Sequence, residues 1–224
     1  MTSTGPDSKL TPEAVERVRA ELQTYVDALA EQMPAESGKR MKDMMAFRTS
    51  ITAETNRGAA LMSAAYLDDK VKELIQNRLV QDKKTLRRAF DFNGPLGTFS
   101  SRIDFSYLLG ILPKNACRDL HTIRAIRNQF AHHAAPLSYE DKEIKPLCER
   151  LIFHGVKDAA GPDSKFRRTV MGLLTYITLA FDKIAFIEAE KDYEIQDRTE
   201  AYRMVSSVFT RITGAEYPIK HHHE

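Results

Sequence analysis

The chain has 224 residues, of which 42% are hydrophobic and 29% are charged. This is the composition of an ordinary globular protein, and it excludes wholesale disorder and a fibrous repeat. The 33 basic and 31 acidic side chains give a formal charge of +2, so no domain-wide positive field is available to hold a nucleic-acid backbone. Direct DNA binding is therefore not indicated, and the length fits a single domain.

The N-terminal segment 1–10 is rich in Ser, Thr, Gly and Pro and has no apolar secretion signal, so we interpret it as a disordered arm of a cytoplasmic protein. Cys117 and Cys148 have no second cysteine pair nearby, which predicts two free thiols rather than a disulfide framework or a zinc ribbon. The most apolar stretch, 169–187, contains an adjacent Asp and Lys, so it predicts a buried helix and not a membrane span.

Apolar residues recur at helical spacing along most of the chain, and no alternating run predicts a strand. In chain order, the pattern predicts helices over 12–33, 51–80, 100–112, 115–131, 166–191 and about 201–212, the second as one long helix or as two, with a short helix between loops in 136–153. The last helix is expected to pack onto the others. The prediction is an all-α helical bundle of seven or eight helices, one domain over 11–214 followed by a flexible tail, 215–224.

The segment between the second and third predicted helices carries two local signals. Two basic pairs at 83–84 and 87–88 are interpreted as a solvated helix face. Two glycines and a proline within 93–97 force an irregular loop that sets the entry angle of the following helix, and no phosphate-binding pattern follows it.

The helix predicted over 115–131 places Arg127 within its apolar stripe. A buried guanidinium must be paired, because it does not shed its proton. One interpretation is an internal ion pair that locks two helices together. The candidate acids for it are Glu54, Asp68, Asp69, Asp104 and Asp119.

The string from Arg127 and Asn128 to His132 resembles the short Arg-polar-x-x-x-His signature of HEPN domains. That resemblance implies an alternative function as a metal-independent endoribonuclease that binds RNA, or as an adaptor on the same scaffold. His132 would move protons, Arg127 would stabilise phosphate charge and Asn128 would orient. On an unbroken helix, however, Arg127 and His132 point about 140° apart. They converge only if the helix ends early or a second subunit contributes one of them.

A wider resemblance covers about a third of the chain, in order and spacing. It rests on ETNRGAAL at 54–61, AAYLDD at 64–69, NGPLGTFSSRID at 93–104 and IRAIRNQFAH at 123–132. In these strings the chain resembles the mannitol operon repressor family. The resemblance implies an all-helical bacterial transcriptional regulator without a helix-turn-helix, which acts through protein–protein contacts.

Charged residues of these strings lie near apolar positions, so we predict a buried charge network between helices. Its members are Glu54, Arg57, Asp68, Asp69, Arg102, Asp104, Arg124 and Arg127. We predict a protein partner and a homo-oligomer, because several apolar helix stripes invite a partner. No cofactor and no metal is predicted, since the three histidines at 221–223 are interpreted as a polar terminus and no nucleophilic arrangement can be assembled.

Overall fold

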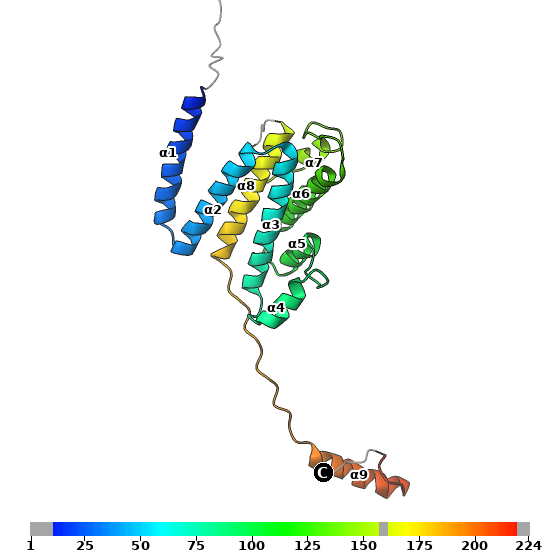
Figure 1. Ribbon diagram of the computed structural model, residues 1–224. Coiled ribbons are helices and arrows are strands. Elements are labelled where there is room, and N and C mark those ends of the chain that lie inside the picture. Colours follow the sequence, from blue (N-terminus) through cyan, green and yellow to red (C-terminus); the bar gives the residue numbers. More distant parts are fainter. Residues whose placement is uncertain (1–10, 157–160, 219–224) are drawn as a thin grey trace, which may run out of the picture. The chain divides into compact units, whose positions relative to one another are not determined.

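A computed structural model describes residues 11–156 and 161–218 (Figure 1). Within these ranges the chain forms nine helices and no strand, which confirms the all-α prediction. The predicted arm over 1–10 and the histidines at 221–223 lie outside the described residues.

The chain divides into two compact units, one ending at Glu188 and the other beginning at Ala189. Each unit is described by itself. The first holds helices α1 to α8 and the second holds α9.

Two helices open the first unit as a hairpin. α1 (Pro12–Glu31) begins as its sequence predicts, because the Thr11 hydroxyl accepts a hydrogen bond from the Ala14 amide at 3.2 Å. α2 (Ala35–Ala53) follows and packs along α1. The sequence predicted a polar connector for most of this second range. Its many Ala, Met, Lys and Arg residues favour a helix even without a strong apolar stripe.

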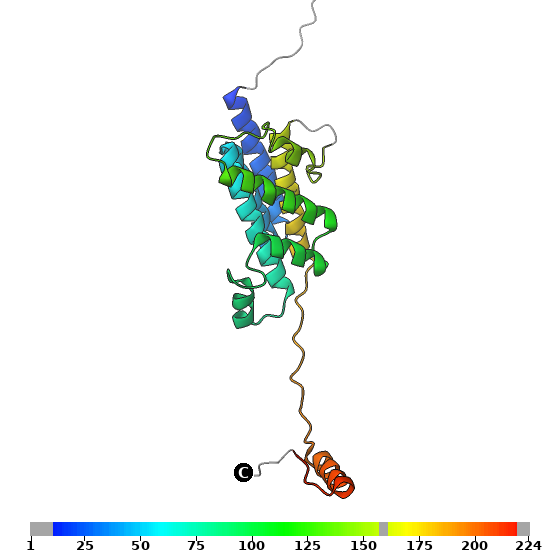
Figure 2. The same cartoon turned by 90° about the vertical axis from the view of Figure 1, so that its right-hand side faces the viewer.

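α3 (Asn56–Arg78) is the central helix of the first unit. It packs against α2 and α8 (Pro162–Phe181) on one side and against α5 (Phe99–Leu108) and α6 (Lys114–His132) on the other (Figures 1 and 2). Thr55 caps α3 by accepting a hydrogen bond from the Gly58 amide, so the second predicted segment is two helices. The buried side of α3 is formed by Ala59, Ala60, Ser63, Ala64, Leu67, Val71, Leu74 and Ile75.

Two short helices complete the first unit. α4 (Lys83–Phe90) carries the basic pairs, and the glycine-containing loop 91–98 leads from it to α5. α7 (Lys145–Glu149) is a short helix within the range 136–153, where a short helix between loops was expected. The rest of that range is a loop whose Tyr139 is buried between the rings of Phe130 and Phe166.

The chain after α8 is hydrogen-bonded to the end of α3. α8 ends at Phe181, ten residues before the end that the sequence predicted, 191. The Ile187 amide donates to the Arg78 carbonyl at 2.8 Å, and the Arg78 guanidinium donates to the Ala185 carbonyl at 2.8 Å. These two bonds, one from a backbone amide and one from the Arg78 side chain, hold the chain where the last turns of the expected helix would lie.

The second unit contains α9 (Thr199–Thr213), which ends on Gly214 in the left-handed conformation, φ 71°. The Phe209 ring meets the Tyr217 ring at 5.4 Å. Within this unit, none of the residues of α9 is buried. Within the described ranges, no helix is long and apolar enough to cross a membrane.

Candidate functional site

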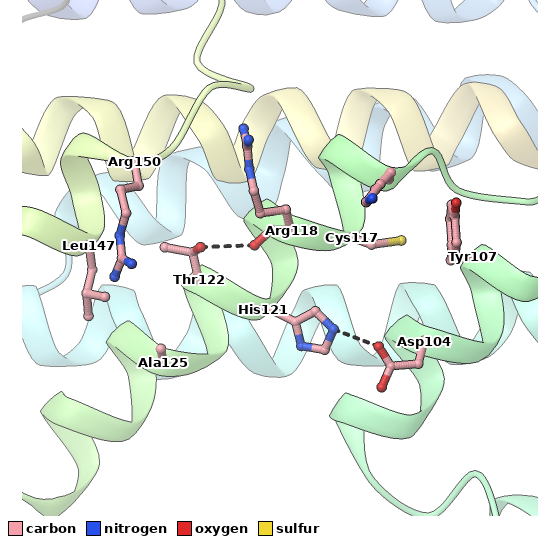
Figure 3. Close-up of a pocket in the computed structure, with 10 residues that line it drawn as sticks. Asp104, Tyr107, Cys117, Arg118, His121, Thr122, Ala125, Leu147 and Arg150 are labelled. Carbon is pink, nitrogen blue, oxygen red and sulfur yellow. Dashed lines mark hydrogen bonds and ion pairs between the residues drawn. The ribbon is translucent and has the colours of Figure 1, made fainter.

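A groove of about 450 Å³ lies where the α5–α6 hairpin meets the end of α7 (Figure 3). Pro113 ends the turn between α5 and α6, so the two helices run side by side and expose one edge of each. The groove is lined by Asp104, Tyr107, Lys114, Cys117, Arg118, His121, Thr122, Ala125, Leu147 and Arg150. It combines an apolar floor with charged walls.

Three cations lie around this groove: Lys114 and Arg118 on α6, and Arg150 at the end of α7. Among the described residues, Lys114 and Arg150 form no ion pair. Arg118 lies 3.7 Å from the buried carboxylate of Asp119 and is itself 57% exposed. The groove therefore presents positive charge to solvent, although the whole chain is nearly neutral.

Asp119 explains how Arg150 comes to lie beside α6. Its carboxylate is fully buried and accepts hydrogen bonds from the amides of Ile152 and Phe153, at 2.8 and 2.9 Å. The segment after α7 is thus held against α6 by a charged acceptor, which gives a strong bond. Asp119 was a sequence candidate for pairing with Arg127. In the structure its carboxylate instead binds the backbone of the segment after α7.

The acidic residue of the groove is Asp104, and it is held by His121 at 2.9 Å (Figure 3). Asp104 is two-thirds exposed and His121 one-third. The contact joins the middle of α5 to the middle of α6. Figure 3 shows the imidazole ring of His121 turned toward the Asp104 carboxylate.

Cys117 forms part of the apolar floor together with Tyr107, Ala125 and Leu147. Burial raises the pKa of the Cys117 thiol. The sulfur also lies 3.7 Å from the Ile103 carbonyl. Cys117 thus contributes apolar surface to the groove.

The predicted charge network is present as one pair. Arg102 grips Asp68 through two bonds of 2.7 Å, and its third nitrogen donates to the Leu96 carbonyl at 2.8 Å. Arg102 is 8% exposed and ties α5 to both α3 and the glycine-containing loop. This bidentate arrangement fixes the angle between the two helices.

The other members of the predicted network are not joined to this pair. Arg57 donates to the carbonyls of His133 and Ala135, which ties the end of α6 to the start of α3. Asp104 binds His121, and the Arg124 Nε is buried without a hydrogen-bond partner in the described structure. The remaining members of the predicted network are exposed, which corrects the prediction that they are buried. These are Glu54, Asp69 and Arg127.

Arg127 is exposed and donates to the Asn128 side chain at 2.9 Å, so the expected buried ion pair is wrong. The reason is the length of α5. It begins at Phe99 and pairs Asp104 with His121, so at 1.5 Å per residue it reaches only the level of about residue 126 of α6. The last turns of α6 extend beyond the end of α5, so α5 does not cover them.

The side chains of the HEPN-like signature do not converge within one chain. They belong to Arg127, Asn128 and His132. α6 is an unbroken helix through His132, so Arg127 and His132 point about 140° apart around its axis. Asn128 is engaged by Arg127, and His132 is exposed in the last turn. The alternative function is not favoured by this geometry.

Sequence reasoning missed the groove cations and His121. A signal was present, because positions 114, 118 and 121 recur at the i, i+4, i+7 spacing of one helix face. Arg150 carried no such signal, since its place beside α6 depends on the long-range contact of Asp119.

Comparison with known proteins agrees with the resemblance seen in the sequence. The profile of a family described as mannitol repressor matches residues 50–164, a range that runs from the end of α2 to the start of α8. The chain belongs to the mannitol repressor family. The matched range contains the groove, the Arg102–Asp68 pair and the end of α6. α1 and α9 lie outside it.

One solved structure is similar to the chain: the X-ray structure of the MtlR–HPr complex from Escherichia coli. It has 18% sequence identity and a TM-score of 0.46, and the match covers 62% of this chain and 99% of that one. A search of the curated proteins found no match.

Proposed function

We propose that this mannitol repressor family member regulates a mannitol-type operon through contact with another protein. The observation that carries the proposal is the family match over residues 50–164. The near-neutral charge agrees with it, because a chain at +2 has little general affinity for DNA. A cytoplasmic location and self-association of the chain belong to the same proposal.

The groove between α5, α6 and α7 is the surface we assign to the partner. Its apolar floor supplies burial, and its three cations supply orientation toward an acidic surface. The similar E. coli protein was solved in complex with HPr, so HPr is the first partner to test.

Regulation is tested in a reporter strain that lacks its own mannitol repressor and carries a mannitol promoter. Expression of the chain is expected to lower reporter output severalfold. The purified chain alone is expected not to shift the promoter fragment in a gel at physiological salt. Unchanged reporter output would contradict the proposed regulation, and a tight shift of DNA would contradict its protein-contact route.

The partner surface is tested by measuring binding of purified HPr from the same host to the chain and two charge-reversal variants. Arg118→Glu reverses a groove cation, and Arg127→Glu reverses an exposed arginine on the same helix outside the groove. We expect Arg118→Glu to weaken binding at least tenfold and Arg127→Glu to change it less than twofold. Equal loss in both variants would contradict the assignment of the groove.

A further inference from the structure

α1 carries an apolar face that the first unit leaves uncovered. The helix packs along α2, and Ala30 is its buried residue. Four large apolar side chains on another face remain half exposed or more. They are Val18 (54%), Leu22 (49%), Tyr25 (68%) and Leu29 (48%).

These positions follow the repeat of a coiled-coil seam. Together with Val15 they are spaced 3, 4, 3 and 4 residues apart, which corresponds to a and d positions over two heptads. At 100° per residue the seam is centred about 110° around the helix from Ala30. α2 therefore lies mainly on another side of α1, although Leu22 also borders a groove with Met45 and Arg48 of α2. The exposed part of the seam is left to an additional helix.

We infer that a second copy of this chain supplies that helix and that two α1 helices pair antiparallel about a two-fold axis. In this register Leu22 of one copy meets Tyr25 of the other, and Val18 meets Leu29. Each contact joins a larger with a smaller side chain, which fills an antiparallel seam evenly. The antiparallel direction also sets the positive end of each helix dipole beside the negative end of the other.

The charges that flank the seam are compatible with self-pairing. Arg19 of one copy lies opposite Val26 of the other, and Glu21 lies opposite Ala28. No like charges meet in this register, so the repulsion that commonly prevents a helix from pairing with itself is absent from the proposed interface. The ion pair between Asp27 and Lys42 lies away from the seam, at the α2 side of α1.

The seam is short, so the dimer is expected to dissociate in the micromolar range. A 20-residue helix is about 30 Å long, and two such helices bury less than a standard protein interface. The oligomeric state should therefore be measured by analytical ultracentrifugation of the full chain from about 1 to 200 µM.

Two variants locate the interface. Leu22→Glu places a charge in the seam, and Leu179→Glu places the same charge on α8 at a leucine of equal exposure, 49%. We expect wild type and Leu179→Glu to dimerise, and Leu22→Glu to remain monomeric at the highest concentration with an unchanged far-UV circular dichroism spectrum. A monomeric wild type, or a dimeric Leu22→Glu, would overturn the inference.

A mixing experiment separates a direct contact from indirect damage. Leu22→Lys alone should also be monomeric, whereas an equimolar mixture of Leu22→Lys with Leu22→Glu should recover the dimer, because positions 22 of the two copies lie within one helical turn. A mixture that stays monomeric would contradict the pairing of α1 with α1. The inference deepens the self-association named in the proposed function. Neither result depends on HPr, so failure here is distinguishable from failure of the proposed regulation through a partner protein.

Discussion

The guanidinium of Arg102 is held at three points, two on Asp68 and one on the Leu96 carbonyl. Asp68→Asn would leave a nearly buried cation without its counter-charge, so we expect a loss of about 3 kcal/mol in the free energy of unfolding. Urea denaturation measures it. Asp69→Asn, on the exposed side of the same helix, should change stability by less than about 0.5 kcal/mol. Equal effects would contradict a specific role for the pair.

Arg127 provides the opposite case. Because its side chain is exposed and bonds only to its neighbour Asn128 among the described residues, Arg127→Ala should change stability by less than about 0.5 kcal/mol. The expected chevron and urea midpoint are those of the wild type. A loss of several kcal/mol in the free energy of unfolding would instead support the buried ion pair that the sequence suggested.

Cys148 gives a pH dependence with a definite sign. Burial raises the pKa of its thiol from 9.0 to about 12. The thiol therefore ionises at lower pH in the unfolded chain than in the folded one. Its contribution to the free energy of unfolding is fully present below about pH 9 and is lost as the pH rises toward 12. Between pH 8 and 10 the wild type should lose about 1 kcal/mol more than Cys148→Ala, measured by urea denaturation at each pH. Parallel losses would contradict the raised pKa.

The sequence indicated some of these residues and not others for a physical reason. A helical wheel gives the direction of Arg127 correctly, but burial also requires a neighbour at the same height, and α5 is too short to provide one. Arg102 and Asp68 were both named as members of the predicted network because they lie in the family-like strings, but their pairing was not predicted. The choice of Asp68 over Asp69 depended on which side of α3 faces α5.

At the scale of the element, the glycine-containing loop before α5 was predictable from its composition. Gly94 and Gly97 allow close backbone approach, because a Cβ at position 97 would lie 2.3 Å from the Phe92 carbonyl and 2.5 Å from that of Asp91. Thr98 and Ser101 then form a capping box that starts α5. The loop and the cap together fix the position of the Arg102 backbone at the start of α5.

Gly97→Ala should therefore destabilise the protein by about 2 kcal/mol or more, since backbone atoms must shift to admit the methyl group. Gly161→Ala is a suitable control, because a Cβ there meets only the flexible Glu140 carboxylate at 3.1 Å. Its cost should stay below about 1 kcal/mol. Thermal or urea unfolding compares the two, and equal costs would argue against the close approach.

Element boundaries were less predictable than element type. α2 was taken for a connector, because its apolar residues do not form a single stripe. α8 was expected to continue to 191, and no sequence pattern marks the two bonds with Arg78 that hold the chain after it. These errors share one cause, which is that contacts between distant segments decide where a helix stops.

At the scale of the whole molecule, the all-α class follows from the 3.6-residue periodicity, but the division into two units does not. The apolar stripe of α9 is the pattern that a buried helix shows, although none of its residues is buried within the second unit. The stretch from Asp182 to Arg198, which contains no helix, separates α9 from α8. A stripe therefore predicts that a helix has a partner without saying which segment or molecule it is.

The position of α8 between α2 and α3 has a consequence for the order of folding events. Arg167 of α8 bonds to the Ile51 carbonyl across 116 residues of sequence, whereas α3, α5 and α6 follow one another closely along the chain. Closing the longer loop costs more chain entropy, so α8 should dock after the transition state. Leu173→Ala on α8 should then mainly accelerate unfolding, and Leu120→Ala on α6, equally buried, should mainly slow folding. Native-state lifetime would thus be governed by a helix that takes little part in nucleation.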